Sequence, residues 1–300
     1  MRIARGFHRA HGLGNDYLVV DEATFGLGVS GPVAARICDR NRGVGSDGVL
    51  VHIAAPDGHD AAVRIFNPDG SEAEKSGNGV RIFAAWCFAN GFDLGAELRI
   101  FTMGGTVRVS YVERKAGAVF LRVSMGRASF RMGALPMIAA DGRDAGADEV
   151  WTRKPLRIGD EDVVTTCVSM GNPHAVLLGA RCDDETLTRL GPRVEQHAQF
   201  PRRTNVQLCE VLDRRRVRML VWERGAGPTL ASGSSACAVV AACAEAGTVD
   251  RDADVTVVMP GGTLIVRIGE DDSVEQLGPV QAICEGTISD DLWSELERSV

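Results

Sequence analysis

Two short polar stretches of the sequence could each hold an anion at the start of a helix. The tetrapeptide SGNG occupies residues 76–79 and SGSS occupies residues 232–235, and each opens a nearly continuous apolar segment. The first N–H groups of a helix have no partner within it and lie at the positive end of its dipole, so they bind carboxylates or phosphates. A serine at this place is also an ordinary N-cap. Because the two starts match and each follows a polar loop that contains glycine, the sequence favours a shared anion site.

Further polar side chains stand at the ends of expected strands. An asparagine in a turn usually reflects turn chemistry alone, so each amide is weak evidence by itself. Arg224 follows an apolar strand, and a guanidinium there can hold a carboxylate through two parallel hydrogen bonds. The asparagines are Asn15, Asn67, Asn172 and Asn205.

Two other motifs carry little weight. His8 and His11 lie three residues apart, but no further ligand pair accompanies them, so no metal site is expected. The stretch GVGSDG at 43–48 fits the spacing of a dinucleotide-binding loop. It follows an expected helix and precedes an expected strand, which is the reverse of the order that such a loop requires.

The elements that must position these groups are mostly short strands. Runs of four to seven residues rich in Val, Ile and Phe alternate with Gly, Asp, Asn and Pro. Four helices are predicted, at 32–40, 77–90, 233–246 and 290–298. The middle two are apolar almost all round and therefore belong inside a core. Their matching starts suggest two similar halves, each with a β-layer around one buried helix, and a break within 127–148.

Composition excludes several classes of protein. With 33 Lys and Arg against 40 Asp and Glu, the net charge is −7, so no nucleic-acid partner is expected. The basic run 214–218 is predicted to be a solvated hairpin tip. No apolar segment is long enough to span a bilayer and no signal peptide is recognised, so no membrane partner is expected. Eight scattered cysteines without a CxxC pair indicate reduced thiols in a cytoplasmic protein.

Five motifs together resemble the diaminopimelate epimerase family. HGLGNDY, FNPDGSEAEKSGNGVR, SMGNPH, TNVQ and ERGAGPTLASGSSACA occur in the family's order, and the resemblance runs from about residue 7 to 286. It implies an α+β fold of two pseudo-symmetric halves. Each half is a mixed β-barrel or sheet wrapped around a central buried helix, and the active site lies in the cleft between them. The halves expected from the resemblance are residues 1–127 with 277–300, and residues 128–276.

The resemblance also implies an activity, namely cofactor-independent epimerisation of a small-molecule amino acid. Interconversion of LL- and meso-diaminopimelate by two-base proton transfer is the first expectation. The implied catalytic residues are Ser76, Ser232, His174 and Glu223, where His174 and Glu223 set the protonation of the other two. The implied substrate-binding residues are Asn15, Asn67, Gly77, Asn78, Asn172, Asn205, Arg224, Gly233 and Ser234. No cofactor is implied, and a homodimer is one option.

The sequence departs from the family at both proton-transfer positions. Family members use two cysteines, whereas this chain has Ser76 and Ser232. A thiol ionises near pH ~8.5, and lower at a helix start, but an alcohol is a far weaker acid. Cys237 lies more than one helical turn inside its helix and cannot simply replace the missing thiol. Three functions therefore stay open: an epimerase whose serines are activated by His174 and Glu223, a same-fold isomerase acting on a more acidic C–H bond, and a catalytically silent amino-acid-binding homologue or substrate-trapping Cys-to-Ser variant.

Overall fold

The protein divides into two compact units, each described here by itself. The computed structural model describes residues 4–74, 76–93, 95, 97–139, 142, 146 and 148–299. Unit 1 comprises Met1–Val123 and Leu277–Val300, and unit 2 comprises Ser124–Gln276. Most of the predicted junction 127–148 is described, but residues 140–141, 143–145 and 147 lie outside the described residues.

Unit 1 is built on mixed parallel and antiparallel strands. Antiparallel pairs join β17 to β1, β1 to β2, β3 to β4, β6 to β7 and β7 to β8, and parallel pairs join β2 to β3 and β4 to β6. The short β5 pairs with β4. The strands are β1 Gly6–Gly12, β2 Asn15–Asp21, β3 Val49–Ile53, β4 Ala61–Phe66, β5 Glu72–Ala73, β6 Leu98–Thr102, β7 Gly105–Lys115, β8 Ala118–Arg127 and β17 Ser273–Thr287, of which β8 and β17 extend into unit 2.

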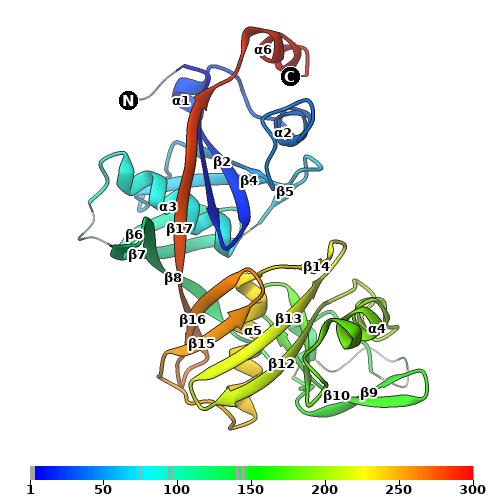
Figure 1. The fold of residues 1–300 in the computed structure, drawn as a ribbon. Helices are drawn as coiled ribbons and strands as arrows, with labels where there is room; N and C mark the ends of the chain where they lie inside the picture. Colours follow the sequence, from blue (N-terminus) through cyan, green and yellow to red (C-terminus); the bar gives the residue numbers. More distant parts are fainter. Residues whose placement is uncertain are drawn as a thin grey trace. The chain divides into compact units, whose positions relative to one another are not determined.

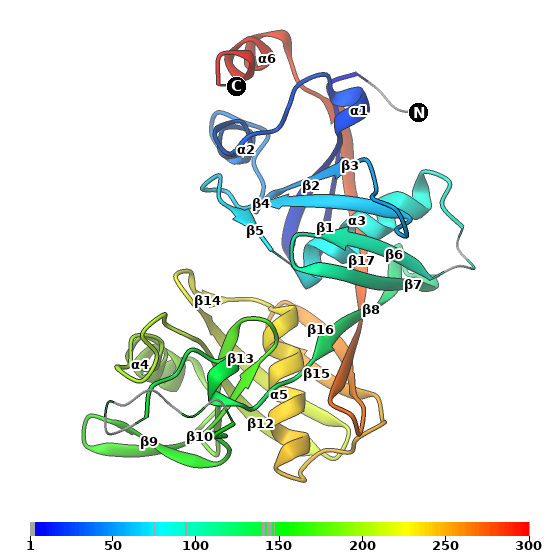
Figure 2. The same ribbon diagram turned by 180° about the vertical axis from the view of Figure 1, so that it is seen from behind.

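Helix α3, Gly77–Ala89, is the central helix of unit 1 and lies within these strands (Figures 1 and 2). It packs against β1, β2, β4 and β7. Nine of its 13 residues are buried, as its all-round apolar sequence predicts. Ser76 is the N-cap, and the chain leaves the helix at Gly91, whose φ of +97° favours glycine.

The smaller helices of unit 1 cover a second part of its core. They are α1 Glu22–Phe25, α2 Gly31–Cys38 and α6 Asp290–Glu297, so α2 ends two residues before the predicted end at residue 40. Trp293 and Leu296 of α6 share a buried cluster with Phe25 and Ile37. The ring centroids of Phe25 and Trp293 lie 5.2 Å apart, edge to face. The last residues of the chain therefore complete a core that the first 40 residues begin.

Unit 2, like unit 1, has mixed parallel and antiparallel strands that pack around one helix. Antiparallel pairs join β9 to β10, β10 to β11, β12 to β13, β13 to β14 and β15 to β16, and parallel pairs join β11 to β12 and β13 to β15. Arg214 and Arg215 form the tip of the β12–β13 hairpin, as predicted, whereas Arg216 and Arg218 of the same basic run belong to β13. The strands are β9 Lys154–Ile158, β10 Glu161–Ser169, β11 Pro173–Leu178, β12 Asn205–Asp213, β13 Arg216–Glu223, β14 Gly227–Thr229, β15 Val255–Met259 and β16 Gly262–Ile268, with a short 3-10 turn at Met132–Ala134.

Helix α5, Gly233–Glu245, is the central helix of unit 2, and Ser232 is its N-cap. It packs against β10, β11, β12, β13, β15 and β16, and Figure 2 shows it lying across the strands of this unit. A further helix, α4 Asp184–Glu195, was not predicted. Its Leu187, Leu190 and Val194 pack into the core beside Leu208. The fold class is α+β, with two sheet-wrapped halves, as the resemblance implied.

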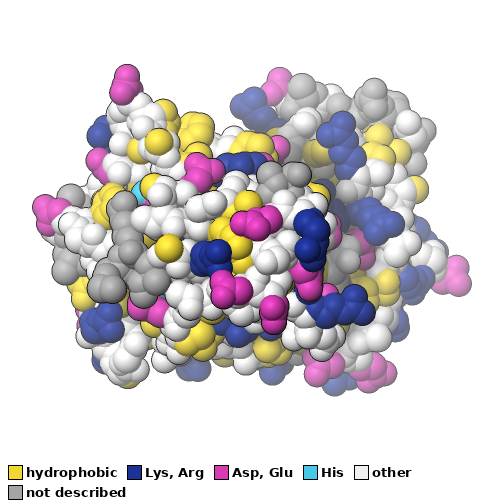
Figure 3. Space-filling model, turned by 90° about the horizontal axis from the view of Figure 1, so that it is seen from above, with side chains coloured by type: hydrophobic (Ala, Val, Ile, Leu, Met, Phe, Trp, Pro, Cys, Tyr) yellow, Lys and Arg dark blue, Asp and Glu magenta, His cyan; other side chains and the backbone are white. Residues whose placement is uncertain are grey.

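The surface in Figure 3 carries basic and acidic side chains interspersed, with hydrophobic atoms in small groups. On the described part of this face, charges of both signs therefore lie close to one another. In the part of the chain that the structure describes, no helix is both long enough and apolar enough to cross a bilayer.

Candidate functional site

The start of α3 holds Ser76 through two contacts. The Ser76 Oγ accepts a hydrogen bond from the Gly79 backbone N–H at 3.0 Å, so this serine caps the helix. The Tyr17 hydroxyl lies 3.3 Å from the same Oγ. The backbone N–H groups of Gly77 and Asn78 occupy the first turn, where the helix supplies them with no acceptor. An anion could bind there beside a hydroxyl pair.

Tyr17 is a residue that the sequence analysis missed. It belongs to β2, is only 6% exposed, and its ring passes next to the backbone of Gly48. A Cβ atom at Gly48 would lie 2.5 Å from the Tyr17 Cε1 atom, and also 2.5 Å from the Phe66 carbonyl oxygen. The glycine at position 48 therefore makes the space in which the Tyr17 ring reaches Ser76.

Two predicted binding residues, Asn15 and Asn78, meet in unit 1. The Asn78 Nδ2 donates to the Asn15 side-chain oxygen at 2.7 Å and to its backbone oxygen at 2.9 Å. The Asn15 amide in turn donates to Asp47 at 3.1 Å, and Arg81 donates to Asn78 Oδ1 at 2.9 Å. Arg81 is 1% exposed within α3. A buried guanidinium must be hydrogen-bonded, so Asn78 has a structural task in this helix start.

Asn67 lies in a turn of its own. Its side chain donates to Ser71 Oγ at 3.0 Å, and its backbone N–H donates to the Ser71 carbonyl at 2.9 Å. Among the contacts of the described residues, none joins Asn67 to Ser76, Asn78 or Asn15. Its assignment to the substrate pocket stays a prediction.

The start of α5 is arranged differently. Ser232 makes no side-chain capping bond to the helix. The Gly233 carbonyl accepts a hydrogen bond from Gln276 Nε2 at 2.8 Å, and a Cβ at Gly233 would lie 3.0 Å from Gln276 Oε1. Ser234, the other predicted donor here, is half-buried. The Ser232 hydroxyl is thus left available while the backbone beside it is fixed.

His174 is completely buried in unit 2 between two amides. Its Nε2 lies 3.0 Å from Asn172 Oδ1, and its Nδ1 lies 3.0 Å from Gln207 Nε2. In this arrangement Gln207 donates to Nδ1, so the imidazole proton is on Nε2 and points to Asn172. Burial, together with the Arg224 charge, lowers the pKa of His174 to about 3. The imidazole is therefore neutral at pH 7.

Gln207 connects His174 to the helix start. The same Nε2 that faces His174 lies 3.0 Å from the Ser235 Oγ, three residues after Ser232. Both Gln207 and Ser235 are fully buried. The sequence analysis assigned no role to either residue, although TNVQ and SGSS each appeared in its motifs. The signal that could have found them is a polar side chain at a position where the pattern demands an apolar one.

The loop after β13 holds Glu223 and Arg224. Burial raises the pKa of Glu223, and the Thr229 hydroxyl, which donates to its Oε1 at 2.7 Å, partly offsets that rise. The Arg224 N–H donates to Asn205 Oδ1 at 3.0 Å, while the Asn205 amide donates to the Pro173 carbonyl at 3.0 Å. Arg224 itself is exposed, and its guanidinium reaches the Arg202 carbonyl at 3.4 Å.

Helix α4 anchors this loop. Glu195, at its end, accepts hydrogen bonds from Trp222 Nε1 at 2.7 Å and from the Gly225 N–H at 2.9 Å. These bonds bracket Glu223 and Arg224 on both sides. Four of the residues predicted in unit 2 therefore form two hydrogen-bonded pairs, Asn172 with His174 and Asn205 with Arg224.

Comparison with known proteins gives full-length relatives. A family model described as diaminopimelate epimerase matches residues 7–131 and 166–283. The chain is 38% identical over 289 residues to diaminopimelate epimerase 2 of a Nostoc species, covering 96% of this chain and 97% of that protein. It is 37% identical over 282 residues to the diaminopimelate epimerase of Moorella thermoacetica, covering 93% and 98%.

Solved structures of more distant proteins share the fold. A predicted epimerase from Pseudomonas aeruginosa superposes with a TM-score of 0.67 at 19% identity, covering 95% of this chain and 99% of that one. A hydroxyproline epimerase from Agrobacterium vitis gives 0.63 at 14% identity, covering 96% and 92%. Because the family model and the full-length relatives both cover most of the sequence, this chain belongs to the diaminopimelate epimerase family.

Proposed function

We propose that this chain is a cofactor-independent amino-acid epimerase that interconverts LL- and meso-diaminopimelate. The observation that carries the proposal is family membership over nearly the whole chain, together with two buried helices that each begin at a serine. In this proposal the N–H groups of Gly77, Asn78, Gly233 and Ser234 bind the substrate carboxylate. Ser76 and Ser232 stand at the two faces of the α-carbon. The asparagines 15, 67, 172 and 205 and Arg224 hold the polar groups of the substrate.

The proton must reach a group that is more acidic than an alcohol. On the Ser76 side, Tyr17 is such a group, because a phenol ionises near pH ~10 whereas an aliphatic alcohol does not ionise in the range where proteins fold. Its hydroxyl lies 3.3 Å from the Ser76 Oγ, which is a long hydrogen-bond contact. We therefore assign the proton transfer on this side to the Tyr17–Ser76 pair rather than to Ser76 alone.

On the Ser232 side, Glu223 is the titratable group with the more suitable chemistry. Its pKa is raised by burial, which moves a carboxyl toward the working range of a general acid or base. His174 is neutral and hydrogen-bonded at both ring nitrogens, so its contribution is to orient its surroundings rather than to carry the proton.

A second function is favoured by the same serines. Both family thiols are replaced by the less acidic hydroxyl, while the polar residues matched to the family pocket are retained. A catalytically silent protein that binds an amino acid would have this pattern. The two functions differ in one measurable step, which is the exchange of the substrate α-hydrogen with solvent.

The test incubates the purified protein with LL- or meso-diaminopimelate in deuterated water. The exchange of the substrate α-hydrogen is monitored by ¹H NMR. An epimerase replaces the α-hydrogen by deuterium and interconverts the isomers, and Tyr17→Phe slows that exchange. A silent binding protein is stabilised by the ligand, seen as a higher melting temperature, without exchange. Exchange of only an activated carbon acid, such as an unsaturated acid, would instead support a same-fold isomerase.

A matched set of variants separates these outcomes. Ser76→Cys with Ser232→Cys restores the family thiols and should raise the exchange rate in either case. Ser234→Cys places a thiol in the same helix start but two residues away, and should give no such gain. If the folded double variant neither binds nor epimerises diaminopimelate, the assignment of the pocket is wrong.

We further infer that the protein works in the cytoplasm, because all eight of its cysteines are free thiols in the structure, and that a homodimer is one option for its assembly. Fractionation of the source cells tests the first inference. Light scattering after size-exclusion chromatography tests the second, because a monomer and a dimer differ twofold in mass.

A further inference from the structure

We propose that Cys209 and Cys243 form an oxidisable dithiol that reacts with small anionic disulfides entering a pocket on unit 2. The pocket has a volume of about 770 Å³, and none of the residues that line it is among those assigned to the substrate site. Cys209 is one of its walls, and Cys243 lies directly behind Cys209. This inference does not depend on the proposed function.

The two sulfur atoms are already in contact. The Cys209 Sγ on β12 lies 4.0 Å from the Cys243 Sγ on α5, within hydrogen-bonding distance for sulfur. A disulfide needs an S–S separation of ~2.0 Å, so the sulfur atoms must close by about 2 Å. The proposal requires the two side chains to rotate toward each other, and the elements that carry them, β12 and α5, already pack against each other.

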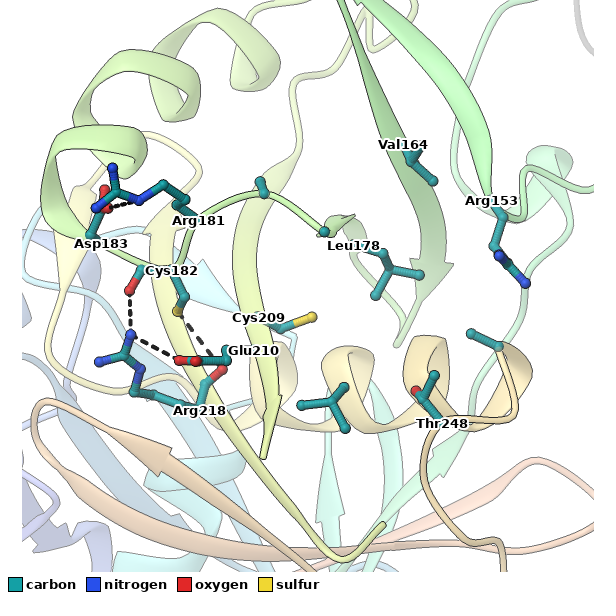
Figure 4. Close-up of a pocket in the computed structure, with 14 residues that line it drawn as sticks. Arg153, Val164, Leu178, Arg181, Cys182, Asp183, Cys209, Glu210, Arg218 and Thr248 are labelled. Atoms are coloured by element: carbon teal, nitrogen blue, oxygen red, sulfur yellow. Dashed lines mark hydrogen bonds and ion pairs between the residues drawn. The ribbon is translucent and has the colours of Figure 1, made fainter. Parts of the chain in front are cut away.

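The pocket gives Cys209 a route to solvent. Its walls come from β10, β11, β12 and β13 and from the segments that follow β11 and α5, and Figure 4 shows the Cys209 sulfur pointing toward α5, near which Thr248 lies. Cys209 is 5% exposed whereas Cys243 is fully buried. A small reagent in the pocket therefore meets Cys209 first.

The charges around the pocket favour an anionic reagent. Arg181 pairs with Asp183 at 3.0 Å, and Arg218 pairs with Glu210 at 2.9 Å, so these four charges are balanced. Arg153 also lines the pocket, and no acidic partner faces it among the described residues. One positive charge is thus left unbalanced, which attracts a disulfide that carries carboxylates.

The contact between the thiols also prepares the first chemical step. The hydrogen bond from the Cys209 thiol lowers the pKa of Cys243, and the same contact, with burial, raises the pKa of Cys209. Cys243 first loses its own proton to solvent, and its thiolate then accepts the Cys209 proton while the Cys209 sulfur attacks a disulfide RSSR. This step forms a Cys209–SR bond and releases RS⁻, which takes a proton from water.

The second step resolves that adduct. The Cys243 thiol gives its proton to solvent, its sulfur attacks the Cys209 sulfur, and the second RS⁻ leaves and is protonated. The balance is one RSSR reduced to two RSH and two protein thiols oxidised to one disulfide.

Cys182 provides a control inside the same pocket. It lines the pocket, but its Sγ faces the carbonyl oxygens of Leu208 at 3.6 Å and Arg218 at 3.8 Å. It has a thiol of the same kind, and among the described residues none of the hydrogen bonds of its Sγ goes to another cysteine. A reagent that merely fills the pocket has equal access to Cys182 and Cys209, whereas the dithiol mechanism selects Cys209.

The experiment exposes the folded native protein to oxidised glutathione and maps disulfides by mass spectrometry under non-reducing conditions. We expect a peptide pair linking Cys209 to Cys243 and no retained glutathione. In Cys243→Ser the adduct stays on Cys209, in Cys209→Ser neither product forms, and Cys182→Ser behaves as the native protein. Circular dichroism confirms that each variant is folded, and the native map needs no variant at all.

A second arm tests the charge. Arg153→Gln should slow oxidation by glutathione disulfide several-fold and leave oxidation by neutral hydroxyethyl disulfide unchanged. The proposal is overturned if the folded native protein acquires no Cys209–Cys243 link, or if Cys182 is modified in preference. It is also overturned if Arg153→Gln slows neither reagent or both alike, because the reagent would not be selected by charge.

Discussion

The two central helices begin with the same residue pair, Ser-Gly, yet the two serines are used differently. Ser76 caps α3 through the Gly79 N–H and meets Tyr17, whereas Ser232 makes no capping bond to α5. Polar contacts hold both starts, but in unit 1 they involve Asn78, two residues after the serine, and in unit 2 they involve Ser235, three residues after it. The same Ser-Gly pair thus supplies a hydroxyl that caps the helix in unit 1 and a hydroxyl that makes no capping bond in unit 2.

The largest expected difference in stability between the two helix starts concerns the residue two positions after each serine. Asn78→Ala removes an acceptor from the buried Arg81 guanidinium and should lower the free energy of unfolding by about 2–3 kcal/mol. Ser234→Ala, the matching change in α5, should stay within about 0.5 kcal/mol. Urea denaturation of both variants measures the difference. Equal losses would mean that the two helix starts are held alike.

The next effect is a pH dependence located in unit 2. The pKa of His174 is about 3 in the folded protein, below its unfolded value near ~6.5. Because the unfolded chain binds the proton more readily, the contribution of His174 to stability is complete above pH ~6.5 and declines as the pH falls toward about 3. Between pH 7 and 5 that loss is about 2 kcal/mol.

His174→Gln should remove this part of the slope, which denaturation at several pH values would show. A slope unchanged by His174→Gln would place the acid sensitivity elsewhere.

The serines themselves should differ by a smaller amount. Ser76→Ala removes a capping bond and should cost about 1 kcal/mol of unfolding free energy, whereas Ser232→Ala should cost less than about 0.5 kcal/mol. Thermal denaturation of the two variants, in the absence of ligand, gives the comparison. A larger loss for Ser232→Ala would contradict the absence of a capping role for that hydroxyl.

The smallest effect concerns Glu223. Thr229→Val removes the hydroxyl that donates to its carboxylate, so the pKa of Glu223 should rise further, with a change in stability of a few tenths of a kcal/mol at pH 4. Carbon-detected NMR titration of the Glu223 carboxyl measures the shift. A downward shift would show that the threonine bond does not favour the ionised form.

Much of the fold could be predicted from sequence because its signals are local. The predicted helices 77–90 and 233–246 are present as α3 and α5, each one residue shorter, since an all-apolar helix bounded by Ser and Gly has clear ends. Five strands were not predicted, namely β1, β5, β9, β14 and β17, and in β17 Gly278 and Pro279 interrupt the run, since proline is rare inside strands. Helix α4 was missed because its apolar face is only Leu187, Leu190 and Val194, and Pro192 lies inside it.

The candidate site was less predictable, because its partners come from distant parts of the chain. The family resemblance supplied Ser76, His174 and Glu223, but nothing local joins Tyr17 to Ser76 or Gln207 to both His174 and Ser235. The missed helix α4 also matters here, since Glu195 anchors the loop that carries Glu223 and Arg224. The roles of these residues in binding and catalysis stay predictions.

Unit 1 is built from two segments that are far apart in the sequence, and this determines which unit can fold first as the chain is synthesised. Residues 124–276 form unit 2 as one uninterrupted stretch, so its core can assemble as soon as that stretch has left the ribosome. Unit 1 must wait for β17 and for Ile288, Trp293 and Leu296, which fill its core. The core of unit 1 therefore stays incomplete until residues 277–299 have also been synthesised, and a chain cut before residue 277 exposes the apolar surface of this unit.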